Sequence, residues 1–85
     1  MSDEGIVAGR TTLARMKSGQ SGTIVEFKGG HGIARRLSAL GLRPGKRITK
    51  TGSMFGRGPV TVRVGGTQIA LGHGAADKII VNLEK

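Results

Sequence analysis

The chain has 85 residues, carries a formal net charge of +9 and contains no cysteine. A chain this short forms one domain with a small core, and the lack of cysteine excludes a disulfide framework and thiolate metal sites. The positive charge excludes no macromolecular partner, because an acidic protein face, anionic lipid and nucleic acid would all be attracted.

The N-terminal part is predicted to begin with a flexible segment, residues 1–10, followed by a single domain over 11–85. At the start of this domain, Thr12 is expected to cap a helical turn that buries Leu13 and Met16, which are three residues apart.

Residues 23–28 alternate well enough to predict a strand after the turn at 18–22. Val25 and Phe27 are expected on the inner face of this strand. Ile24 would then lie on the face that carries the charged side chains.

Residues 29–45, GGHGIARRLSALGLRPG, predict a short amphipathic helix. Ile33, Leu37 and Leu40 recur at i, i+4 and i+7 and form one apolar stripe. We assign Leu37 and Leu40 to the core, with the alternative that Leu40 lies in a partner contact.

The end of this helix has a clear signal. Gly41 suits the left-handed position after the last turn, Leu42 would then pack back against Leu37, and Pro44 prevents continuation. The sequence therefore predicts a sharp exit from the helix.

The segment after the helix is predicted to form a strand over 47–51, with Ile48 as its only aliphatic residue. A glycine-rich loop, residues 52–59, follows and presents Met54 and Phe55. Either these two side chains meet a partner or they pack back onto the domain.

A β-hairpin is the clearest local prediction. Residues 60–64 and 67–71 alternate around Gly65-Gly66, a pair suited to a two-residue turn. This register places five aliphatic side chains on one face: Val60, Val62, Val64, Ile69 and Leu71.

The last segment is predicted to form a helical turn within residues 72–78, followed by a strand with Ile79, Val81 and Leu83 on one face. About five short strands cannot bury their faces as a flat sheet of this size. We therefore expect a mainly β fold, a small SH3-like barrel with a short helical insertion and no exposed sheet edges.

The residues that carry chemistry are few. Five carboxylates and two histidines, His31 and His73, 42 positions apart, do not form a catalytic pattern, so we expect no enzyme. No spacing specifies a metal site, and no cofactor is required. Iron or zinc binding stays open as an alternative.

The basic centre of the chain leaves nucleic acid as a second alternative. No Asp or Glu lies between Phe27 and Ala76, whereas nine basic residues do. The usual stacking residues are scarce, because the chain has neither Trp nor Tyr. Nucleic acid is therefore a less favoured partner than an acidic protein surface.

Several segments together form a family pattern: Leu13, Gly19, Gly22–Ile24, Arg35–Gly45 (RRLSALGLRPG), Gly58–Leu71 (GPVTVRVGGTQIAL) and Ala76–Val81. They cover about residues 12–81 and resemble the FeoA family, the ferrous iron transport protein A domain. The sequence departs from the family at Gly72-His73-Gly74, where a charged run is usual, and in its glycine-rich entry to the helix.

The resemblance implies an SH3-like cytoplasmic adaptor that works with a FeoB-type membrane ferrous iron transporter, which carries a GTPase domain. We predict a partner-binding surface in which basic residues orient the complex and two apolar residues anchor it. Its members are Arg35, Arg36, Arg43, Lys46, Arg47, Met54 and Phe55.

Overall fold

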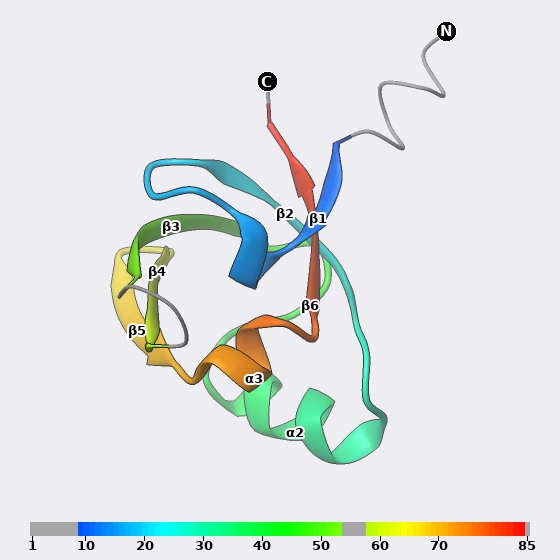
Figure 1. Ribbon diagram of the computed structural model, residues 1–85. Helices are drawn as coiled ribbons and strands as arrows, with labels where there is room; N and C mark the ends of the chain where they lie inside the picture. Colours follow the sequence, from blue (N-terminus) through cyan, green and yellow to red (C-terminus); the bar gives the residue numbers. More distant parts are fainter. Residues whose placement is uncertain (1–8, 54–57, 85) are drawn as a thin grey trace, which may run out of the picture.

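The computed structural model describes residues 9–53 and 58–84, so the predicted anchors Met54 and Phe55 lie outside the described residues (Figure 1). The strands are β1 (Arg10–Thr12), β2 (Ser21–Phe27), β3 (Arg47–Ser53), β4 (Val60–Val64), β5 (Thr67–Leu71) and β6 (Ile79–Leu83). The helices are the 3-10 turn η1 (Leu13–Arg15), α2 (His31–Ala39) and α3 (His73–Ala76).

The strands form one antiparallel sheet in the order β1-β6-β2-β3-β4-β5, which bends around a single core (Figure 1). The predicted mainly β, SH3-like architecture is confirmed, with six strands in place of about five. The expectation that closure removes all edges is wrong, because β1 and β5 end the sheet and do not pair with each other.

The predicted hairpin is confirmed in its register. Val60 pairs with Leu71, Val62 with Ile69 and Val64 with Thr67. Every aliphatic side chain of this set is buried except that of Ile69, which is half-buried and packs against the core. Gly65 and Gly66 have φ of 57° and 89°, as a type I′ turn requires.

The predicted inner face of β2 is confirmed at Phe27, which packs against the core, and is wrong at Val25 and Ile24. Ile24 is buried, whereas Val25 and Phe27 are half-buried and Glu26 is exposed. The pairing of β2 with β6 shifts register between Ile24 and Glu26, so a bulge at Val25 interrupts the alternation. Ile24 and Phe27 therefore both face the core, on either side of the bulge.

The N-terminal turn is confirmed. The Thr12 hydroxyl accepts a hydrogen bond from the Arg15 backbone N–H at 3.3 Å, and Leu13 and Met16 are buried. Strand β1, which precedes this turn and pairs with β6, was not predicted. Its three residues carry too little alternation to mark a strand.

Lys50 is the one charged residue that is buried in the described part of the chain, with 2% of its surface exposed. Lys50 is one of the nine basic residues between Phe27 and Ala76, but its burial removes it from any basic surface. Its ammonium group donates to the carbonyl oxygens of Leu13, Ala14 and Met16 at 3.2, 3.1 and 2.5 Å. Lys50 therefore ties β3 to the end of η1.

Candidate partner-binding surface

The C-terminal end of α2 determines which leucines face the core. Gly41, with φ of 93°, donates its N–H to the Ser38 carbonyl at 2.9 Å, and the Leu42 N–H donates to the Leu37 carbonyl at 3.0 Å. These two bonds form the Schellman motif that the sequence predicts. The motif turns the chain so that Leu42 enters the core beside Leu37.

Leu40 does not enter the core. Its side chain is 49% exposed, and it is the large hydrophobic residue that stands out as exposed in the described residues. The assignment of Leu40 to the core is therefore wrong, because Leu42 takes the inward position that the helical period gives to Leu40. The alternative, that Leu40 lies in a partner contact, stays a prediction.

Two neighbouring hollows meet at Leu40 and together make what we call the α2–β5 groove. The first, about 390 Å³, lies between α2, the end of β5 and α3. Its apolar lining residues are Ile33, Leu37, Leu40, Ala70, Leu71 and Ala75. The second, about 300 Å³, continues past Leu40 to Val64 and Thr67 at the hairpin turn. The two hollows of the groove therefore lie at the two ends of β5, with Leu40 between them.

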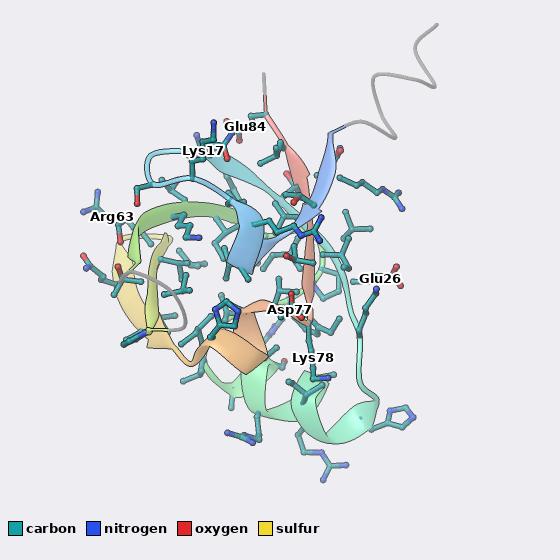
Figure 2. All side chains as sticks on the ribbon, viewed as in Figure 1. Lys17, Glu26, Arg63, Asp77, Lys78 and Glu84 are labelled. Atoms are coloured by element: carbon teal, nitrogen blue, oxygen red, sulfur yellow. The ribbon has the colours of Figure 1, made fainter. Side chains whose placement is uncertain are left out.

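Basic side chains line both ends of this groove. Arg36 and Lys78 belong to the first hollow, and Arg43 and Lys46 belong to the second. Figure 2 shows Lys78 beside α2, far from Glu84 at the other end of the sheet. No described carboxylate lines either hollow. The groove thus combines an apolar floor with a positively charged rim.

The structure therefore brings together three of the predicted basic residues, Arg36, Arg43 and Lys46. Arg35 is exposed on α2 but lines neither hollow. Arg47 is engaged elsewhere, since its guanidinium donates to both carboxylate oxygens of Glu84, at 2.5 and 3.0 Å.

The Arg47–Glu84 pair shifts the protonation of both groups. The hydrogen bond from Arg47 is the largest cause and lowers the pKa of Glu84. Desolvation opposes it, and the positive charge of Arg47 adds a smaller lowering effect. The same contact raises the pKa of Arg47. Both side chains are substantially exposed, so the pair adds little stability and fixes the orientation of Arg47.

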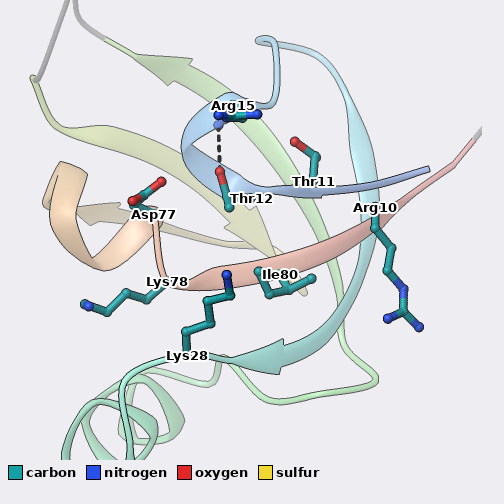
Figure 3. Close-up of a pocket in the computed structure, with 8 residues that line it drawn as sticks. All are labelled: Arg10, Thr11, Thr12, Arg15, Lys28, Asp77, Lys78 and Ile80. Atoms are coloured by element: carbon teal, nitrogen blue, oxygen red, sulfur yellow. Dashed lines mark hydrogen bonds between the residues drawn. The ribbon is translucent and has the colours of Figure 1, made fainter. Parts of the chain in front are cut away.

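Another hollow of about 490 Å³ lies across β1, η1 and β6 and shares Lys78 with the α2–β5 groove (Figure 3). Arg10 and Lys78 leave it in different directions, and the Asp77 carboxylate forms part of its wall (Figure 3). The Thr12 hydroxyl is already used to cap η1. The polar groups of this hollow do not converge on one point, as a catalytic or anion-binding site would require.

The residues that the structure describes contain no group of three or more His, Cys, Asp or Glu side chains able to hold a metal ion. His31 is exposed at the start of α2, and His73 is half-buried at the start of α3. Over the same described residues, no helix is long and apolar enough to cross a membrane.

Sequence reasoning found the basic residues but missed the groove. The sequence does carry a signal for the exposure of Leu40. In the Schellman motif that it predicts, Leu42 contacts Leu37, so Leu40 is not needed in the core. The other side of the groove is formed by β5. Its position at the edge of the sheet depends on the order of the strands, which no local sequence pattern indicates.

Comparison with known proteins places these features in a family. The FeoA domain model matches residues 11–83. A crystal structure of an iron uptake regulatory protein, FeoA, is 35% identical, with a TM-score of 0.81 over 88% of this chain and 97% of that one. No curated protein sequence matches this chain.

Two further structures are similar. Stenotrophomonas maltophilia FeoA, described as an SH3 domain protein complexed with zinc, is 28% identical, with a TM-score of 0.74 over 88% of this chain and 96% of that one. A manganese-dependent transcriptional repressor shares the fold at 20% identity and a TM-score of 0.80, over 88% of this chain and 42% of that one. The family match, the SH3-like sheet and the similar FeoA structures agree: this chain belongs to the FeoA family.

Proposed function

We propose that this chain is a non-enzymatic accessory protein of ferrous iron uptake that acts in the cytoplasm by binding a FeoB-type membrane transporter. Family membership supports the iron-uptake role. The relative from Stenotrophomonas maltophilia is described as possibly acting as a bacterial ferrous iron transport activating factor. Such a role requires a surface for another protein.

The observation that carries the proposal is the α2–β5 groove with Leu40 half exposed at its centre. An exposed leucine beside an apolar hollow is typical of an anchor that a partner covers. The basic rim would steer and orient an acidic face of the partner. The predicted anchors Met54 and Phe55 remain part of the proposal.

A nucleic-acid role has less support. Phe27 is the one Phe, Tyr or Trp residue in the described part of the chain, and its ring packs against the core. Large aromatic side chains on which bases could stack are therefore not exposed there.

The direct test is a titration of the isolated cytoplasmic domain of the cognate transporter with this protein. Leu40→Ala should weaken binding about tenfold, or about 1.4 kcal/mol, because the anchor area is lost. The double variant Met54→Ala, Phe55→Ala tests the other predicted anchors. If wild-type protein does not bind, the proposal is wrong.

Arg36 and Arg35 offer a matched pair of variants. Both are exposed arginines on α2, but only Arg36 lines the groove. Arg36→Gln should weaken binding more than Arg35→Gln, although each removes one positive charge. Equal effects would show that net charge, and not this groove, directs the association.

A further inference from the structure

Strand β5 is an edge strand whose outward backbone groups are available. It pairs only with β4 and ends the sheet. The two-residue turn makes Val64 and Thr67 a hydrogen-bonded pair, so bonding to β4 alternates along β5. Thr67, Ile69 and Leu71 therefore bond inward to β4. Gln68 and Ala70 direct their N–H and C=O groups away from the sheet.

Nothing in the described residues satisfies these outward groups. Gln68 and Ala70 are exposed, and among residues 9–53 and 58–84 no further hydrogen bond reaches their backbone. An unpaired row of this kind is a template for another strand. A β-strand added here would find two donors and two acceptors already in register.

The same edge borders the α2–β5 groove. Thr67 lines the hollow at one end of the strand, and Ala70 and Leu71 line the hollow at the other end. Side chains opposite Thr67 and Leu71 on an added strand would face the core side of the sheet, toward the two hollows that these residues line. Alternate side chains would face solvent.

We propose that the partner docks by adding an extended segment to the β5 edge, with aliphatic side chains at alternate positions in the groove and acidic side chains at its ends. This inference rests on the proposed function, since the segment belongs to the cytoplasmic part of the transporter. Main-chain hydrogen bonds supply affinity in such a mode, and the pockets for alternate side chains supply specificity.

Charge selects an acidic segment over a second copy of this chain. Arg36 and Lys78 line one end of the groove, Arg43 and Lys46 line the other, and no described carboxylate offsets them there. Two copies, each with a formal net charge of +9, would bring these rims together and repel each other. An acidic segment gains from the same charges.

The test uses Ala70→Pro and Ala70→Ser, binding to the isolated cytoplasmic domain of the transporter. Proline removes an outward N–H at this position and fixes φ at about −65°, and an edge strand tolerates proline where that N–H faces away from the sheet. Serine keeps that N–H and is the matched control. Ala70→Pro should weaken binding at least tenfold, and Ala70→Ser less than threefold. A circular dichroism spectrum like that of wild type shows that each variant folds.

Amide hydrogen exchange of wild-type protein decides the question even where Ala70→Pro fails to fold. The amides of Gln68 and Ala70 should become slow to exchange when the transporter domain is added. If wild-type protein binds but these amides remain fast, strand addition is wrong and the proposed function stands. If wild-type protein does not bind, both are wrong. If this chain forms a dimer that Ala70→Pro converts to a monomer, the β5 edge is an interface between two copies of the chain. The proposal of an acidic partner segment at this edge would then be wrong.

Discussion

Lys50 provides the sharpest test of how this small core is held together. Lys50→Met keeps an unbranched side chain of similar length but removes the ammonium group, which donates to three carbonyls. Leu13 O would keep a bond from the Met16 N–H at 3.2 Å. The carbonyls of Ala14 and Met16 would lose the donor that Lys50 supplies.

The expected loss follows from this count. Each buried carbonyl left unsatisfied costs about 1–3 kcal/mol, and relief from burying a charge offsets part of the sum. We expect a net loss of about 2–4 kcal/mol. The total stability of an 85-residue domain is of the order of 4–13 kcal/mol, so the change is large.

Urea unfolding followed by circular dichroism measures this loss. The midpoint should fall with an unchanged slope, and Lys17→Met, the same substitution at an exposed lysine, should change stability by less than about 0.5 kcal/mol. If the free energy of unfolding of Lys50→Met lies within that range of the wild-type value, the predicted loss is wrong. The hydrogen bonds of Lys50 would then only offset the free-energy cost of burying its charge.

The protonation of Lys50 adds an independent check. Burial lowers the pKa of Lys50 below its ordinary value. Between the native and the unfolded pKa of Lys50, the unfolded chain binds more protons at this side chain than the native protein does. The free energy of unfolding should therefore rise with pH across that interval. Lys50→Met should remove that rise in unfolding experiments across the alkaline range.

Three further substitutions test local features by thermal unfolding. Gly22→Ala should cost about 1–3 kcal/mol, because the new methyl group would lie 2.5 Å from both a side-chain carbon of Val81 and the Asn82 carbonyl; an unchanged melting temperature would contradict this packing. Gly41→Ala should cost about 1–2 kcal/mol from its positive φ alone, since the space around it is open, and a smaller loss would mean that the helix end rearranges. Arg47→Gln should lower the melting temperature slightly at neutral pH but not near pH 2. The pKa of Glu84 is lowered in the native state, so the stability that the ion pair contributes is lost as the pH falls through that pKa. An equal effect of the substitution at both pH values would rule out the ion pair.

The sequence predicts the hairpin and the end of α2 in detail because both depend on local rules. Gly65-Gly66 determines the turn and therefore the register, and Gly41 determines the exit from the helix. The inner face of β2 could not be predicted, because the bulge at Val25 shifts every later residue by one and no residue type marks it.

The candidate site shows the same division. Composition identifies basic residues, but not that Arg36, Arg43 and Lys46 share one groove while Arg47 pairs with Glu84. These relations join segments far apart in the chain. They depend on the order of the strands, which periodicity does not report.

The exposed leucine and the open strand edge lie beside the same groove but have separate structural causes. A closed barrel would pair β5 with β1, and a helix one residue shorter or longer would turn a different leucine inward. In this chain, Leu42 fills the core position at the end of α2, so Leu40 is left beside the unpaired β5 edge. Half of its surface remains in water, so folding gains little from its size. Leu40 contributes little to the core and lies beside the outward backbone groups of β5. Binding of a partner in the groove therefore accounts for this leucine better than the stability of the domain does.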